Sequence, residues 1–130
     1  MQATPKFRRK PEGNPDPAIR RSDCPISSVL DLIGDKWSLL IIRDLLMGKK
    51  RFGEFMQSPE AITSSILTTR LKWLQTCEFV EAHQYETKPP RYEYRLTAKG
   101  QSLRPLIQEA ARWGHRYLPN TWELPASFLA

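Results

Sequence analysis

Cysteine is scarce in this 130-residue sequence, and long hydrophobic runs are missing. Cys24 and Cys77 are too few for a disulfide framework, and with His83 and His115 they show no spacing typical of a metal site. The longest apolar run, residues 39–42, is far shorter than the roughly 20 apolar residues of a membrane-spanning helix. The first residues also lack the apolar stretch of a secretory signal. We therefore expect no metal site, no membrane partner and a cytoplasmic location.

Groups of catalytic side chains are missing as well. The sequence shows no carboxylate pair, no Ser-His-Asp set and no glycine-rich loop that could hold a phosphate. We expect a protein that is not an enzyme and needs no cofactor. A length of 130 residues fits one compact domain with tails.

Positive charge is in excess, with a formal net charge of +6. Residues 1–21 contain six basic and two acidic side chains, so much of the excess lies in this N-terminal stretch. Four prolines, with Phe7 and Ile19 as the only large apolar side chains, predict a flexible basic arm over residues 1–22. The arm is either a solvated tail or a segment that follows a groove of DNA.

Helical periodicity begins sharply after this arm. Pro25 suits the first position of a helix, which makes Cys24 the N-cap residue. Apolar residues then recur on one helical face up to a stop near Gly34. They are Ile26, Val29, Leu30 and Ile33. A second helix over residues 36–47 is apolar on nearly every side, so it belongs at the centre of a helical bundle.

Two further helices follow, and the second has two chemically different faces. A short helix over residues 53–57 is expected to bury Phe52, Phe55 and Met56. Thr63 is expected to cap a helix that continues to residue 77. On a helical wheel one face is apolar, with Leu67, Leu71 and Leu74. The opposite arc carries small hydrogen-bonding groups and one cation, namely Ser65, Thr68, Thr69, Lys72 and Thr76.

The hydrophobic period then changes to that of a strand. Residues 79–85 and 92–96 alternate as half-buried strands do, and a stiff, basic tip joins them. Thr97 is expected to cap one long last helix, kinked near Pro105 and ended by Pro119. Its apolar stripe is broader than one small domain is expected to cover, and includes Leu103, Leu106, Ile107, Ala110, Trp113 and Tyr117.

The main domain is expected to span residues 23–119, followed by a tail over residues 120–130. That tail is too apolar to be left in water, so we expect it to fold back on this molecule or on a partner. Its apolar residues are Trp122, Leu124, Phe128 and Leu129.

A short helix, a tight turn and a second helix with a polar face match a helix-turn-helix, whose second helix enters the major groove. Hydroxyl groups can donate to or accept from base edges, and cations reach phosphates. The hairpin then forms a wing. The sequence predicts a mainly α fold with a β-hairpin wing that binds double-stranded DNA through Ser64, Ser65, Thr68, Thr69, Arg70, Lys72, Lys88 and Arg91. A solvated helix face, or a winged-helix module that binds protein, stays open as an alternative.

Short motifs over about 90 residues occur in the order and spacing of one known family. They are Cys24-Pro25-Ile26, Gly34-Asp35-Lys36-Trp37, Ile42-Arg43-Asp44-Leu45, Arg51-Phe52-Gly53-Glu54, Leu67-Thr68-Thr69-Arg70-Leu71, Pro89-Pro90-Arg91-Tyr92-Glu93-Tyr94, Leu96-Thr97-Ala98-Lys99-Gly100 and Trp113-Gly114. In these the chain resembles the HxlR-type winged helix-turn-helix regulators, relatives of the MarR group. The resemblance implies a homodimer, joined through its first and last helices, that binds a nearly palindromic operator and usually represses transcription.

Two residues depart from the family's pattern. Glu78 stands where the helix after the turn usually ends in glycine, and a left-handed backbone there costs a non-glycine residue about 1 kcal/mol. Either the helix ends differently or the wing leaves at another angle. Trp73 occupies a position that is more often charged, and the helical wheel turns it away from core and DNA toward a neighbouring element.

Cys24 is a candidate redox sensor, because several family members sense oxidants through the cysteine of this Cys-Pro motif. A thiol at a helix N-terminus near Arg20 and Arg21 is expected to form more of the reactive thiolate, although Asp23 opposes this. The alternative is a small cysteine that only packs at the dimer interface. Cys77 is expected to be inert.

The effector is otherwise unknown. A small molecule between the long helices is a further possibility, with Trp37, Trp113 and Tyr117 lining its pocket. Aromatic residues at that spacing are more often core.

Overall fold

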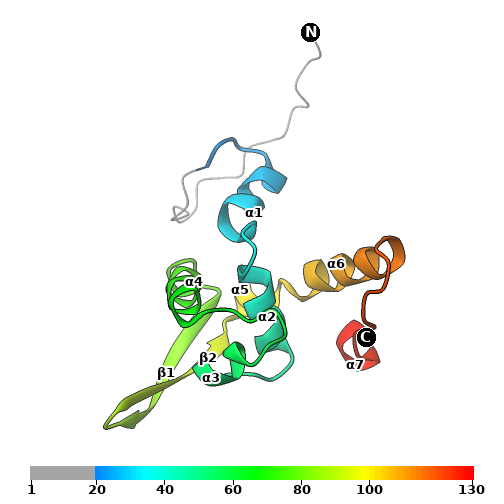
Figure 1. Ribbon diagram of the computed structural model, residues 1–130. Coiled ribbons are helices and arrows are strands. Elements are labelled where there is room, and N and C mark those ends of the chain that lie inside the picture. Colours follow the sequence, from blue (N-terminus) through cyan, green and yellow to red (C-terminus); the bar gives the residue numbers. More distant parts are fainter. Residues whose placement is uncertain (1–19) are drawn as a thin grey trace.

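The computed structural model describes residues 20–130, and shows a group of helices from which a β-hairpin projects (Figure 1). The elements, in chain order, are α1 (Pro25–Ile33), α2 (Ser38–Leu46), α3 (Phe52–Met56), α4 (Ser64–Thr76), β1 (Val80–Thr87), β2 (Pro90–Leu96), α5 (Ala98–Gln101), α6 (Arg104–Tyr117) and α7 (Ala126–Leu129). The two strands pair antiparallel. The predicted fold class is confirmed, whereas residues 1–19 of the predicted arm lie outside the described residues.

The core forms where α2, α3 and α4 meet the start of β1. Helix α2 runs through the middle of the molecule (Figure 1), and its Ile41 and Ile42 are buried, as predicted. Phe55 of α3 is also buried, but Met56 is 40% exposed, so its predicted burial was wrong. Only one side of a five-residue helix can face the core, and in α3 that side carries Phe55 and not Met56.

Helix α2 begins two residues later than predicted, at Ser38. The Asp35 carboxylate accepts hydrogen bonds from the backbone N–H groups of Trp37 and Ser38, both at 3.0 Å. These N–H groups have no partner inside the helix, and a carboxylate at this end also complements the helix dipole. Asp35 therefore fixes where α2 starts.

Most of the wing projects from the body without a core of its own. Val80 is buried, but every later residue of β1 is exposed, so the half-buried alternation predicted for this strand was wrong. The strands are longer than predicted, and pair from Val80 with Leu96 out to Thr87 with Pro90. The register shifts between Gln84 and Glu86 and leaves Tyr85 as a β-bulge.

The last helix is divided, contrary to the single kinked helix predicted. Thr97 caps α5 as expected, and its hydroxyl accepts from the N–H of Gly100 at 3.1 Å. The regular α-helical hydrogen bonding is interrupted at Ser102 and Leu103, although both residues keep right-handed helical dihedral angles, and Pro105 lies in the first turn of α6. Proline lacks the N–H and clashes with the carbonyl four residues earlier, so it starts a new helix here.

The C-terminal tail folds back on α6. Phe128 of α7 is buried, and its carbonyl accepts a hydrogen bond from the buried Gln108 amide at 2.7 Å. Arg112 donates to the carbonyl of Leu129 at 2.7 Å. Trp122 stays 75% exposed, so the predicted folding back on this molecule holds for the end of the tail and not for Trp122.

Gly100 allows α5 to lie against the chain that enters β1. A Cβ atom at this position would lie 2.1 Å from the carbonyl oxygen of Phe79, so backbone would have to move. We expect Gly100→Ala to lower the free energy of unfolding by about 1–3 kcal/mol, measured by urea denaturation at fixed chain concentration. Gly53→Ala is the control, because a Cβ there meets no atom within 4 Å. Equal destabilisation of both variants would contradict the close approach.

Across residues 20–130, none of the helices is both long and apolar enough to traverse a bilayer.

Candidate nucleic-acid interface

Helix α4 is anchored by one face and open on the other. Thr63 caps it as predicted, and the Thr63 hydroxyl accepts from the N–H of Ile66 at 3.4 Å. The three leucines of the predicted core face are all buried, namely Leu67, Leu71 and Leu74. The predicted polar side chains of the opposite arc are exposed, namely Ser65, Thr68, Thr69, Lys72 and Thr76. Ser64 in the first turn is exposed as well.

The hydroxyl groups on the open face are held in defined orientations. Thr68 donates to the carbonyl of Ser64 at 2.8 Å, and Thr69 donates to that of Ser65 at 3.0 Å. Each threonine oxygen then still has lone pairs that can accept from a donor outside the helix. The face presents small acceptors and the Lys72 ammonium, and lets another molecule approach the helix closely.

Arg70, also predicted to contact DNA, takes part in a contact within the protein. Its guanidinium lies 3.5 Å from the Asp35 carboxylate and is half-buried. Burial of Asp35 favours its neutral form, but hydrogen bonds from Ser38 and Trp37 and the charge of Arg70 outweigh this and lower the Asp35 pKa. Arg70 therefore joins α4 to the N-terminus of α2.

Trp73 covers a neighbouring element, as predicted. Its indole N–H donates to the carbonyl of Leu32 in α1 at 2.7 Å, and the half-buried ring packs against the core. The C-terminal turn of α1 has free carbonyls that need such donors. The contact fixes α1 relative to α4.

Glu78 adopts the left-handed conformation that a glycine would favour, with φ of 64°. Helix α4 is thus followed by a left-handed residue although no glycine stands there. Two donors stabilise the turn: the Thr97 hydroxyl donates to the carbonyl of Glu78, and Lys99 donates to that of Cys77 at 2.8 Å. Both belong to the segment after the wing, so they also fix where the wing leaves α4.

A polar network that the sequence did not predict, partly buried, stabilises the turn between α3 and α4. Asp44 of α2 is buried and accepts from the Ser58 hydroxyl, which in turn accepts from Lys49 at 2.7 Å. Arg43 donates to Asp44 and forms a bidentate pair with Glu60 at 3.0 and 2.8 Å. The hydrogen bond from Arg43 is the main reason why the Glu60 pKa is lowered. We name these five residues the turn network.

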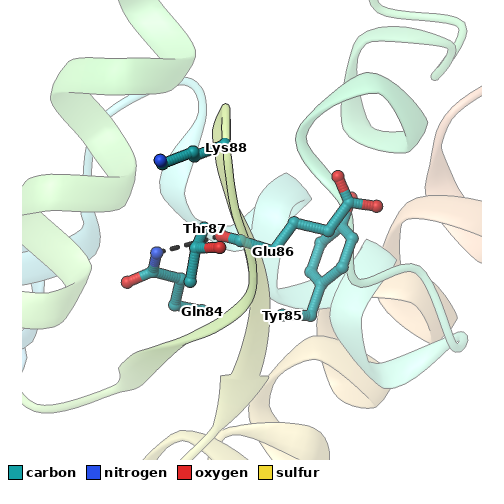
Figure 2. Close-up of a pocket in the computed structure, with 5 residues that line it drawn as sticks. All are labelled: Gln84, Tyr85, Glu86, Thr87 and Lys88. Atoms are coloured by element: carbon teal, nitrogen blue, oxygen red, sulfur yellow. Dashed lines mark hydrogen bonds between the residues drawn. The ribbon is translucent and has the colours of Figure 1, made fainter.

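The wing tip carries the two cations predicted to meet DNA, in different settings. Lys88 lies at the end of the hairpin. Figure 2 shows Lys88 and Gln84 on one side of the strand and Tyr85 and Glu86 on the other. Arg91 pairs with Glu86 at 3.2 Å, so a phosphate would have to compete with that carboxylate for its guanidinium.

Cys24 lies at the N-cap of α1, as predicted, and is half-buried, whereas Cys77 is fully buried. The two cysteines are not joined by a disulfide. Arg21, expected to lie near Cys24, instead binds Asp31 through its side chain at 2.6 Å and its backbone N–H at 3.2 Å. Its positive charge is therefore matched by a carboxylate of α1.

Apolar side chains are exposed on α1 and α6. Ile26, Leu30 and Val29 of α1 are 73%, 54% and 39% exposed. On α6 the predicted stripe is also largely exposed, including Leu106, Ala110, Trp113 and Tyr117. Leu103 is half-buried, and Ile107 is buried in the chain's own core. We name the exposed apolar residues of α1 and α6 the α1–α6 surface.

The three aromatic residues considered for an effector pocket differ in their surroundings. Trp37 packs half-buried against the core, whereas Trp113 and Tyr117 are each 59% exposed with ring centroids 5.2 Å apart. Among residues 20–130 no group of three or more His, Cys, Asp or Glu could hold a metal ion.

Comparison with known proteins gives one consistent family. YdeP of Bacillus subtilis, an HTH-type transcriptional regulator, is 36% identical over 104 residues, which span 80% of this chain and 81% of YdeP. The structure of PA1607, described as a transcription factor, superposes with a TM-score of 0.71 at 38% identity and covers 81% of this chain and 74% of its own. The structure of the reduced form of the redox regulator HypR superposes with a TM-score of 0.67 at 35% identity, and the match covers 72% of this chain and 92% of HypR. Residues 32–122 match the model of the HxlR-like helix-turn-helix, and the chain belongs to this family of transcriptional regulators.

Proposed function

We propose that this protein is a homodimeric, DNA-binding transcriptional repressor without enzymatic activity. Helix α4 enters the major groove with Ser64, Ser65, Thr68, Thr69 and Lys72, and Lys88 of the wing reaches the backbone beside it. The observation that carries the proposal is the division of α4 into a buried leucine face and an exposed hydroxyl-and-lysine face. A helix anchored in this way can insert its other side into a groove without loss of core packing.

The α1–α6 surface supports the homodimer. Exposed apolar side chains of this size mark interaction sites, because contact with water is costly. A second copy brings the same side chains and can bury both sets across a twofold axis. Two copies of α4 would then read the two halves of a palindromic operator. Arg70 serves the fold through Asp35 in this proposal, and Ile107 serves the core.

The proposal is tested with the purified chain and a fluorescent DNA fragment from upstream of its own gene. Anisotropy titrations compare this fragment with unrelated DNA of the same length at several salt concentrations. We expect the specific fragment to bind at least about 1,000-fold more tightly, with two chains per site. Equal affinity for both fragments would exclude sequence-specific regulation and favour a module that binds protein.

We further propose that Cys24 makes DNA binding responsive to oxidants. Its thiol is the more exposed of the two, and HypR, which shares the fold, is described as a redox regulator. Diamide takes two electrons and two protons from the Cys24 thiol and a glutathione thiol, and the two sulfurs form a mixed disulfide. Such a group at the start of α1 would be bulky beside the α1–α6 surface.

We expect diamide with glutathione to change the operator affinity of the parent by about 5- to 150-fold, the usual range of coupling between two sites. Cys24→Ser should not respond, and Cys77→Ala should respond as the parent does. Mass spectrometry of intact protein reports the added glutathione. A response that survives in Cys24→Ser would refute the assignment.

A further inference from the structure

The outer half of the wing has no buried side chain to fix its direction. Beyond Val80 all of β1 is exposed, and so are the first three residues of β2. Packing into the core therefore sets only the root of the hairpin. Whatever holds the outer wing at a defined angle to α4 has to be a smaller set of contacts.

Arg51, the residue before α3, makes such contacts with both strands. Its backbone forms an antiparallel bridge with Glu93 of β2, and its side chain donates to the Glu93 carboxylate at 3.2 Å. On the other strand, its guanidinium carbon lies 4.4 Å from the centre of the Tyr85 ring. Arg51 is itself fixed, because its N–H donates to the Glu54 carboxylate at 3.0 Å.

The β-bulge explains why Tyr85 can reach Arg51. Side chains alternate between the two faces of a regular strand, but a bulge inserts one extra residue and turns its side chain. Figure 2 accordingly shows Tyr85 and its neighbour Glu86 on the same side of the strand. The extra residue directs the ring to Arg51, and Lys88 in the turn beyond β1 lies on the opposite side.

We propose that Arg51, through Glu93 and Tyr85, is a positioning residue that holds the wing at the angle at which Lys88 meets a DNA phosphate. The part concerning DNA rests on the proposed function, whereas the angle of the wing does not. Arg51 is 53% exposed, so a direct contact with phosphate is the competing explanation that the experiment has to separate.

The angle is measured by the distance between spin labels at Thr87→Cys in the wing and Glu109→Cys on α6. The chain carries Cys24→Ser, and labelled chains are diluted in unlabelled chains so that each pair lies within one subunit. We expect a narrow distance distribution in the parent and in Tyr85→Phe, which retains the aromatic ring. Arg51→Ala and Glu93→Gln should both broaden it, with unchanged circular dichroism melting. An unchanged distribution in both variants would overturn the proposal, whether or not the protein binds DNA.

The role in DNA binding is measured by a double-mutant cycle with Lys88→Ala. Each lost phosphate contact lowers the slope of log affinity against log salt by about 0.9. A dimer loses the contact from both of its subunits, so if Arg51 acts through the wing, Arg51→Ala, Lys88→Ala and the double variant should each lower the slope by the same amount, about 1.8. If Arg51 itself touches a phosphate, the double variant loses about 3.6, which would refute the positioning role.

Discussion

Asp44→Ala is expected to lower the free energy of unfolding by about 3–5 kcal/mol. Asp44 is the buried carboxylate of the turn network, and its loss would leave the buried Ser58 hydroxyl and part of the Arg43 guanidinium without their acceptor. Removing one partner of a buried charged pair costs more than the pair contributes, because the other stays desolvated. The measurement is urea denaturation followed by circular dichroism, at one chain concentration for all variants.

Two variants control this prediction. Asp44→Asn keeps an acceptor for Ser58 and should lose less than Asp44→Ala. Glu109→Ala removes an exposed partner of Arg112 on α6 and should change stability by less than about 1 kcal/mol. A loss for Asp44→Ala no greater than that for Glu109→Ala would show that the turn network does not support the turn before α4.

The second large effect concerns the open face of α4. Replacing Ser65, Thr69 and Lys72 together with alanine is expected to weaken operator binding by about 100-fold, because the dimer loses six contacts of about 0.5 kcal/mol each, which add to about 3 kcal/mol. The salt dependence should weaken as well, by a slope of about 1.8, because both subunits lose the Lys72 contact. Anisotropy titrations with the upstream fragment give both quantities.

The matched control removes two polar side chains and one cation elsewhere. Gln101, Ser127 and Arg116 are exposed and lie outside α4 and the wing. The variant with all three changed to alanine should bind the operator as the parent does, with its dimer checked by size-exclusion chromatography. If the α4 variant melts like the parent and still binds with parental affinity, α4 is not the reading helix.

Sequence patterns predicted the elements whose signals are local. Pro25 starts α1, Thr63 caps α4, and the leucines of α4 face the core. These features could be predicted because each signal acts within about two helical turns. The predictions failed where a neighbour far along the chain decides the outcome. The outer wing alternates in sequence like a half-buried strand, but no part of residues 20–130 covers it.

The candidate site was predicted in the same uneven way. The exposed hydroxyl face of α4 followed from the helical wheel alone. The turn network was missed because Asp44 and Ser58 are 14 residues apart. The contact of Arg70 with Asp35, which lies in the segment between α1 and α2, was missed for the same reason, and a contact of Arg70 with DNA stays a prediction. A buried carboxylate in an otherwise apolar helix was the available signal, since such a group needs a partner.

The exposed side chains of α1 and α6 have a consequence for the amount of protein a cell has to keep. If association covers them, mass action ties the melting temperature of the chain to its concentration. Dilution would then produce single chains that display Ile26, Leu30 and Trp113 to proteases and chaperones. The amount of folded protein would fall steeply once the chain concentration drops below the value needed for association. A low concentration would then end regulation by this protein as sharply as a signal does.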